Sequence, residues 1–253
     1  MNLTAQEVYN HILDFFIAAS GRDWDSDGRA EVLEESDQPC LLRTACMGNP
    51  ERTMQGELFA YLKKMNRLRP VLEYRHHRLD GEDAGRGRGN SIDIMVFDAS
   101  YCPIVAVELK HHSRQQGTLN RLIATLAADR KRLSKLSVPS VQIGLYTELL
   151  DLGEYAASRD KYQDFRFITA YAYAEDKVGQ HKLNMRTAAK PLDASALREW
   201  ASKNFEPFDS SFSGRAESFS TRDGAVVQGR VHYIVGLGQP GLGPSVCSVE
   251  HQS

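Results

Sequence analysis

The sequence predicts an α/β domain in which a mixed central sheet is flanked by helices. Residues 91–98 (SIDIMVFD) and 104–110 (IVAVELK) are short apolar runs that contain several β-branched residues, as expected of strands. Apolar residues recur at helical spacing in longer segments before and after these runs. The links between the expected strands are short, which favours antiparallel neighbours. At 253 residues the chain is long enough for a domain with a sizeable core.

The composition gives no sign of export or of a membrane span. The N-terminus lacks a basic stretch followed by an uninterrupted apolar core, and no segment approaches the roughly 18 to 20 uncharged apolar residues that cross a bilayer. The four cysteines are scattered and form no CxxC pair; they are Cys40, Cys46, Cys102 and Cys247. We therefore expect a cytoplasmic protein with reduced thiols and no membrane partner.

A capping box predicts the first helix. Thr4 and Glu7 have the spacing of reciprocal caps, and the helix that they open runs to about Ser20. Its buried face consists of Val8, Ile12, Phe15 and Ala19. Residues 21–53 are acidic. We therefore expect residues 1–53 to form an N-terminal helix and an acidic loop, ahead of an α/β core at 54–204.

A second helix is predicted over residues 53–69. It ends before Pro70, because the residue that precedes a proline avoids the helical conformation. Its apolar stripe consists of Met54, Leu58, Leu62, Met65 and Leu68. Glu57 lies about 100° from Leu58 around the helix axis, at the edge of this stripe. That position is where a helix meets the sheet that it covers.

The remaining elements follow in order. Strands are expected at 71–79, 91–98 and 104–110, and their short links predict a three-stranded meander. In the second of these strands, one face carries Ile92, Ile94 and Val96, and the other carries Asp93, Met95 and Phe97. The later elements are a helix at 114–136, a strand at 141–150, a strand at 165–174 and a helix at 193–204. From Phe205 onward glycine and serine become frequent, so residues 205–253 are expected to form a flexible or loosely packed tail, in which GRVHYIVGL could add an edge strand.

The third strand of the meander ends in charged residues. Glu108 and Lys110 are two positions apart, so their side chains lie on the same face of an extended chain, with Ile104 and Ala106. They form either a surface ion pair or one end of an active site. Asp93 lies fifteen residues before Glu108. A hairpin between these strands, even one that diverges at its end, brings both carboxylates to one end of the sheet.

Two carboxylates that converge have a characteristic chemistry. They repel each other unless one is protonated or a hard cation lies between them. Oxygen ligands of this kind suit Mg²⁺ or Mn²⁺. A neighbouring lysine balances negative charge, orients a metal-bound water and helps to deprotonate it. The combination suits the hydrolysis of a phosphodiester.

The pattern Asp93-x14-Glu108-Leu109-Lys110 on adjacent strands, behind a helical Glu57, resembles the PD-(D/E)XK nuclease superfamily. The resemblance implies a restriction-endonuclease-like core of order αβββαβ, which corresponds here to residues 54–150. It also implies that Asp93 and Glu108 are metal ligands and that Lys110 is the catalytic lysine. Glu57 would complete the acidic cluster, and the Leu109 carbonyl would be a further ligand. The residue before Asp93 is isoleucine, where the family motif has a proline.

An excess of basic residues in the middle of the chain bears on the kind of molecule that the protein binds. Residues 63–135 carry fifteen bases and eight acids, which form either solvated faces or a polyanion-binding surface. The candidate phosphate contacts are Arg86, Arg88, Arg114 and Arg121. By the resemblance we expect a Mg²⁺-dependent deoxyribonuclease, for which a restriction or phage-defence role follows from the habits of the family. Double-strand cutting would favour a homodimer. The alternatives are an RNA-directed nuclease on the same fold and a binding module, for nucleic acid or protein, without turnover.

Overall fold

The computed structural model describes residues 3–19, 41, 44, 49–75, 91–99, 102–112, 119–134, 165–176, 194–220 and 226–239. Its strands are β1 (Leu68–Arg75), β2 (Ser91–Asp98), β3 (Pro103–His112), β4 (Arg166–Asp176), β5 (Phe208–Ser220) and β6 (Val226–Gly238). They form one six-stranded sheet in the order β1-β2-β3-β4-β6-β5. The sheet is mixed, because β3 and β4 are parallel and the other neighbours are antiparallel. The predicted α/β class with a mixed sheet is confirmed.

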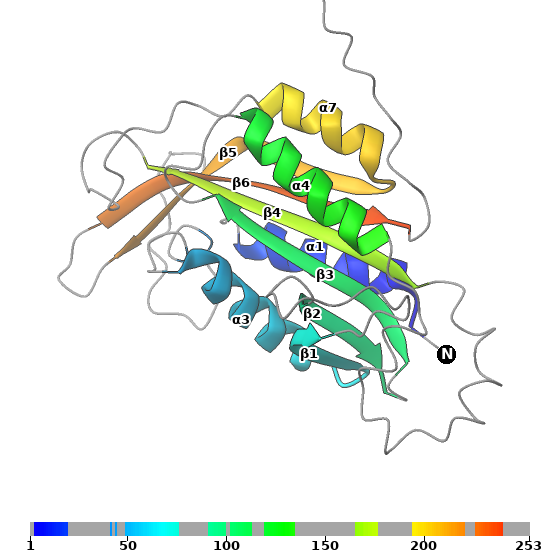
Figure 1. Ribbon diagram of the computed structural model, residues 1–253. Helices are drawn as coiled ribbons and strands as arrows, with labels where there is room; N and C mark the ends of the chain where they lie inside the picture. Colours follow the sequence, from blue (N-terminus) through cyan, green and yellow to red (C-terminus); the bar gives the residue numbers. More distant parts are fainter. Residues whose placement is uncertain are drawn as a thin grey trace, which may run out of the picture.

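Helices cover both faces of this sheet (Figure 1). They are α1 (Ala5–Ala19), α3 (Pro50–Lys63), α4 (Leu119–Ser134) and α7 (Ala194–Asn204). The side chains of α1 and α3 pack in one buried cluster, and those of α4 and α7 pack in a second cluster, against the other face of the sheet. None of the helices in the described ranges is both long enough and apolar enough to cross a membrane.

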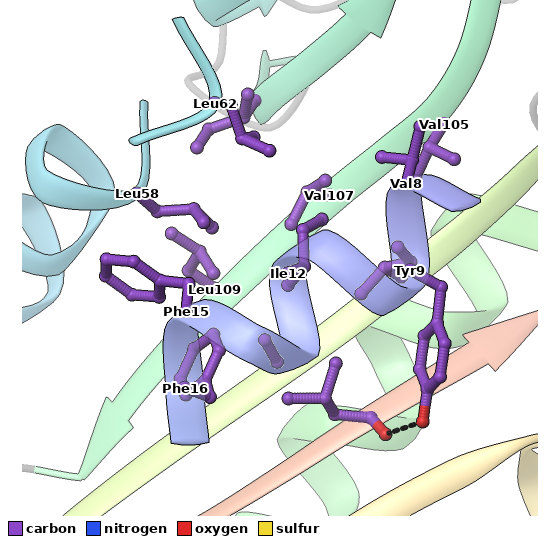
Figure 2. Close-up of a cluster of buried hydrophobic side chains, with 14 of the residues drawn as sticks. Val8, Tyr9, Ile12, Phe15, Phe16, Leu58, Leu62, Val105, Val107 and Leu109 are labelled. Carbon is purple, nitrogen blue, oxygen red and sulfur yellow. Dashed lines mark hydrogen bonds between the residues drawn. The ribbon is translucent and has the colours of Figure 1, made fainter. Parts of the chain in front are cut away.

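The predicted capping box opens α1. The backbone N–H of Thr4 donates to Glu7 Oε2 at 2.7 Å, and the backbone N–H of Glu7 donates to Thr4 Oγ1 at 3.2 Å. The helix buries the face that its spacing predicts, and Figure 2 shows that face packed against α3 and β3. On the same helix, the Tyr9 hydroxyl donates to the Val235 carbonyl of β6 at 3.3 Å. The N-terminal helix thus belongs to the same core as the sheet, although the sequence places it in a separate N-terminal segment.

The second helix begins and ends earlier than the sequence predicts. Asn49 caps it, because its side-chain oxygen accepts from the Arg52 N–H at 3.2 Å, and Pro50 occupies the first turn, where no amide donor is needed. The helix ends at Lys63, so residues 64–69, which the sequence predicts to be helical, lie outside it. Leu68 begins β1, and Pro70 lies within that strand. Because β1 is at the edge of the sheet, a proline without an N–H is tolerated there.

The predicted meander is confirmed, with two local changes of face. Antiparallel pairing joins β1 to β2 and β2 to β3. Ile92 packs with Met95 and Phe97, not with Ile94 as predicted. On the neighbouring strand Glu73, which lies between the residues paired with Ile92 and Ile94, has a left-handed φ of 48°, and this irregularity explains the change of face.

The second change of face is at Ile104. The sequence groups this residue with Ala106, but the two lie in opposite clusters. The pairing of β2 with β3 shifts there: Val96 pairs with Val105, and Phe97 pairs with Pro103. Ile104 is therefore the extra residue of a bulge, which reverses the alternation at the start of the strand.

The elements after the meander agree in part with the prediction. Helix α4 lies within the expected 114–136, and α7 has nearly the bounds expected of the helix at 193–204. The strand expected at 165–174 is β4, whose residues from Arg166 to Tyr173 pair in parallel with β3. The strand expected at 141–150 lies outside the described residues.

The expectation of a loosely packed tail from residue 205 is wrong for the described residues. Strands β5 and β6 both come from this segment, and β6 lies inside the sheet, between β4 and β5. Glycine is needed here for close approach: a Cβ on Gly236 or Gly238 would overlap the ring of Phe205 or Phe167. Composition suggested a flexible segment, whereas the glycines allow aromatic rings to pack on a strand.

Candidate functional site

Two charged side chains of β3 face α4 in the second half of the strand. Glu108 and Lys110 alternate with Val107 and Leu109, which point into the cluster formed with α1 and α3. Glu108 and Lys110 therefore lie on the opposite face, as the spacing predicts. Glu108 is only 4% exposed. This burial excludes a surface ion pair.

Asp93 reaches the same place from β2. The ladder between β2 and β3 runs as far as the pair Ile94 and Val107. One step further, Asp93 Oδ2 accepts a hydrogen bond from the backbone N–H of Leu109 at 2.6 Å. The carboxylate thus binds a β3 amide at the point where the described ladder ends. The predicted convergence of the two strands on one site is seen in this contact.

The two oxygens of Glu108 have different surroundings. Oε1 lies 3.4 Å from Lys110 Nζ and also forms an ion pair with Arg132 of α4. Oε2 is buried and has no hydrogen-bond partner among the residues that the structure describes. A buried carboxylate oxygen without a partner loses its hydration and regains nothing in exchange. Two protein cations thus lie at one oxygen of the carboxylate, while the other oxygen has no hydrogen-bond partner among the described residues.

Further charged groups surround Lys110 and Arg132. Lys110 Nζ lies 3.6 Å from Glu51 Oε1 of α3 and 3.7 Å from Asp129 Oδ2 of α4. Arg132 lies 3.7 Å from the same Asp129 and donates to the Ser91 carbonyl of β2 at 2.7 Å. The site therefore draws on α3, α4, β2 and β3.

Burial shifts the acidity of both strand carboxylates in the same direction. It raises the pKa of Asp93 to about 6, although the Leu109 amide and Lys110 favour the charged form. Burial and, after it, the Asp93 carboxylate raise the pKa of Glu108 to about 7, against the effects of Arg132 and Lys110. Near neutral pH an additional positive charge close to the two carboxylates therefore stabilises their ionised forms.

Lys110 remains a cation in this setting. Burial lowers the pKa of Lys110, but the carboxylates around it, with Glu108 first, outweigh burial and hold its pKa above the ordinary value. A protonated lysine can donate hydrogen bonds and balance negative charge. It cannot accept a proton near neutral pH.

The helical carboxylate beside Lys110 is Glu51. The sequence predicts Glu57 for this position, but Glu57 Oε2 accepts a hydrogen bond from Thr44 at 3.0 Å. Six residues separate the two glutamates, which corresponds to about 120° around the helix axis. Glu51 also accepts from the backbone N–H of His111 at 3.3 Å. The earlier start of α3 therefore changes which glutamate reaches the sheet.

Sequence reasoning missed Gln55, one turn further along α3. Its amide donates to the Asp93 carbonyl at 2.7 Å and to Glu73 Oε1 at 3.2 Å, and the residue is 5% exposed. The four-residue spacing of Glu51 and Gln55 places both on one face of the helix. That spacing was the available signal, together with Asp129 and Arg132, which are three residues apart on α4.

The other predicted contacts are only partly visible. Arg86, Arg88 and Arg114 lie outside the described residues, and for Arg121 the structure describes the backbone but not the side chain. Leu109 takes part through its amide, which binds Asp93, and its side chain is fully buried.

The donor set suits a hard cation that is held by few protein ligands. Within the described ranges no three His, Cys, Asp or Glu side chains gather closely enough to hold a metal ion by themselves. Mg²⁺ is usually held by only one or two carboxylates, with waters and substrate phosphates completing its shell. The unpartnered Oε2 of Glu108 and the carboxylate of Asp93 fit such a site.

Comparisons with known proteins add no relative. No protein-family model matches the chain, and neither a curated protein nor a solved structure matches it.

Proposed function

We propose that the protein is a metal-dependent nuclease that hydrolyses DNA phosphodiesters at the site formed by Asp93, Glu108 and Lys110. The observation that carries the proposal is the division of Glu108: one oxygen is neutralised by Lys110 and Arg132, and the other is buried without a hydrogen-bond partner among the described residues. A divalent cation would supply positive charge on that open side and lower the pKa of a bound water.

The order of elements supports the same proposal. From α3 to β4 the described helices and strands follow the sequence α3, β1, β2, β3, α4, β4, which is the αβββαβ order of the restriction-endonuclease-like core. Among the described residues the strand that follows α4 is β4 (Arg166–Asp176), and the strand expected at 141–150 lies outside them. Asp93, Glu108 and Lys110 occupy the second and third strands, as the resemblance to PD-(D/E)XK nucleases implies.

Each residue of the chain has a distinct task under this proposal. Asp93 and Glu108 would hold the cation, and the Leu109 amide fixes the carboxylate of Asp93. Lys110, which stays protonated, donates hydrogen bonds to the attacking water or to the phosphate and stabilises the negative charge that develops. Glu51 and Asp129 hold the lysine ammonium between α3 and α4. The choice of DNA rests on the resemblance and on the excess of bases between residues 63 and 135.

The test is a cleavage assay with three kinds of nucleic acid and three conditions, two with a metal ion and one with a chelator. Plasmid DNA, linear or single-stranded DNA, and RNA are incubated with Mg²⁺, Mn²⁺ or EDTA. We expect cleavage of DNA with either metal and none with EDTA. Asp93→Asn, Glu108→Gln and Lys110→Met should each lower the rate by at least about 100-fold. Glu199→Gln is the matched control, because Glu199 is exposed on α7 and forms its ion pair with Lys203 of the same helix.

Three outcomes would contradict the proposal. The first is that the wild-type protein cuts no nucleic acid with any metal. The second is that cutting persists in EDTA. The third is that folded Glu108→Gln protein cuts as fast as the wild type. Preferential cutting of RNA would keep the site and change the substrate.

A further inference from the structure

Thr169 of β4 lies directly beside Glu108 in the sheet. The parallel register of β3 and β4 pairs Glu108 with Thr169 and Lys110 with Tyr171. Residues paired across neighbouring strands point to the same face of the sheet. Thr169 also alternates with Ile168 and Ala170, which lie in the cluster on the α1 and α3 face. Its hydroxyl therefore lies on the α4 face, next to the candidate site.

The Thr169 hydroxyl shares an anomaly with Glu108. Thr169 is 2% exposed, and its Oγ1 has no hydrogen-bond partner in the described part of the chain. The same holds for Glu108 Oε2, so these two oxygens do not bond to each other. Buried polar atoms are normally satisfied by protein or by a bound species. Two unsatisfied oxygens on paired residues therefore indicate a small polar ligand between them.

The opposite side of Thr169 offers the hydroxyl no polar side chain. On β6 the residue paired with Thr169 is Gly236, and the ring of Phe205 lies over this glycine. Phe205 is itself 5% exposed and belongs to the apolar cluster on this face. Of the two strands that flank β4, only β3 presents a polar side chain at this level of the sheet. Among the residues paired with Thr169, the polar neighbour of the hydroxyl is therefore Glu108.

We infer that Thr169 is a positioning residue of the proposed metal site, and that its hydroxyl holds a cation-bound water against Glu108 Oε2. An ionised carboxylate only accepts hydrogen bonds, whereas a threonine hydroxyl both donates and accepts. Water between the two donates to the carboxylate and to the hydroxyl, so both oxygens are satisfied. This inference rests on the proposed function, because it assigns the ligand of Glu108 to a hydrated divalent cation.

The test uses the full chain and measures binding and stability separately. Mn²⁺ is titrated by calorimetry into the wild type and into Thr169→Val, Thr169→Ser and Glu108→Gln. We expect Thr169→Val to weaken Mn²⁺ binding by about tenfold, the lower end of the range for residues that orient metal ligands, and Thr169→Ser to restore it. In metal-free protein, denaturant unfolding should show Thr169→Val to be at least as stable as the wild type, because valine has the shape of threonine and removes an unsatisfied hydroxyl.

The opposite signs of these two effects separate a role in the site from a role in the core. A matched control is Thr44→Val: Thr44 is also fully buried, but its hydroxyl bonds to Glu57. This variant should lose stability and keep the Mn²⁺ affinity of the wild type. Unchanged Mn²⁺ affinity in Thr169→Val overturns the inference and leaves the proposed function standing if Glu108→Gln has lost binding. Equal Mn²⁺ affinity of the wild type and Glu108→Gln overturns both the inference and the proposed function, and comparing these two proteins is enough to detect it.

Discussion

Arg132 of α4 and Glu108 of β3 form an ion pair on a face of the sheet where Glu108 is almost completely buried. The same guanidinium donates to the Ser91 carbonyl at 2.7 Å, so one side chain ties α4 to the beginning of β2 and to the middle of β3. Since Ser91 lies two residues before Asp93, Arg132 holds together the two strands that carry the carboxylates. The site and the docking of α4 thus depend on a shared contact.

Replacement of Arg132 should therefore cost stability. Arg132→Gln leaves Glu108 buried with Lys110 as its remaining cation, and we expect a loss of about 2 to 4 kcal/mol in the free energy of unfolding, near the lower end for a broken buried pair because Arg132 is partly exposed. Urea unfolding followed by circular dichroism measures the loss. Lys131→Gln, at the exposed neighbouring position of the same helix, is the control and should change stability by less than about 0.5 kcal/mol. Equal stability of the two variants would show that the pair contributes nothing.

The acidity of the two carboxylates predicts an unusual dependence of stability on pH. The pKa of Asp93 is raised to about 6 and that of Glu108 to about 7, so the folded protein keeps these protons at a pH where the unfolded chain has released them. Because the folded state then binds more protons, the contribution of this pair to the free energy of unfolding falls as the pH rises from about 4 to about 7, and it levels off above that range. We expect a loss on the order of a few kcal/mol.

The measurement compares the wild type with the double variant Asp93→Asn/Glu108→Gln at several pH values. The difference between the two unfolding free energies isolates the pair from all other titrating groups. We expect this difference to move in favour of the double variant as the pH rises, and Mg²⁺ at pH 8 to restore stability to the wild type alone. A difference that does not change with pH would mean that the carboxylates ionise as they do in the unfolded chain.

The helical glutamate gives a third prediction. Glu51 lies 3.6 Å from Lys110 and accepts from the His111 amide, whereas Glu57 accepts from Thr44. If the proposed nuclease activity is present, Glu51→Gln should lower the cleavage rate by about 10- to 100-fold, the range for residues that orient an active group. The loss of cleavage rate in Glu57→Gln should be at least about tenfold smaller than the loss in Glu51→Gln. The rates are compared at saturating Mg²⁺ with both variants confirmed as folded, and a larger loss in Glu57→Gln would return the role to the residue that the sequence favours.

The contrast between these glutamates shows how far sequence reasoning reaches. Periodicity and spacing place Asp93, Glu108 and Lys110 correctly on two neighbouring strands, because the breaks in alternation at Ile92 and Ile104 lie outside the stretches 94–97 and 105–109. The bounds predicted for the second helix lie too late in the chain. Its start depends on the Asn49 cap and Pro50, whereas the prediction rests on the apolar stripe. The partners on α4 and β4 depend on tertiary packing across long separations in the chain, which local patterns do not encode.

The C-terminal strands show that composition alone is a poor guide to structure. Glycine and serine lowered the expectation of structure from residue 205 onward, yet β6 buries Tyr233, Val235 and Leu237 in the core. Its valines, isoleucine and tyrosine favour a strand, whereas its glycines do not. Its neighbours β4 and β5 supply the pairing, and the rings of Phe205 and Phe167 fill the space that the glycines leave.

The close packing of Phe205 on Gly236 gives the fourth prediction, which two glycines test with opposite signs. A Cβ at position 236 would overlap the Phe205 ring, so Gly236→Ala forces the buried ring to move and should destabilise the fold by about 1 to 3 kcal/mol. Gly56 lies in the interior of α3, is exposed, and has no atom within 4 Å of an added Cβ. Gly56→Ala should therefore stabilise the fold by about 0.5 to 1 kcal/mol, because alanine loses less backbone entropy in a helix. Urea unfolding of both variants decides the matter, since a neutral Gly236→Ala would mean that β6 does not hold Phe205 against the sheet.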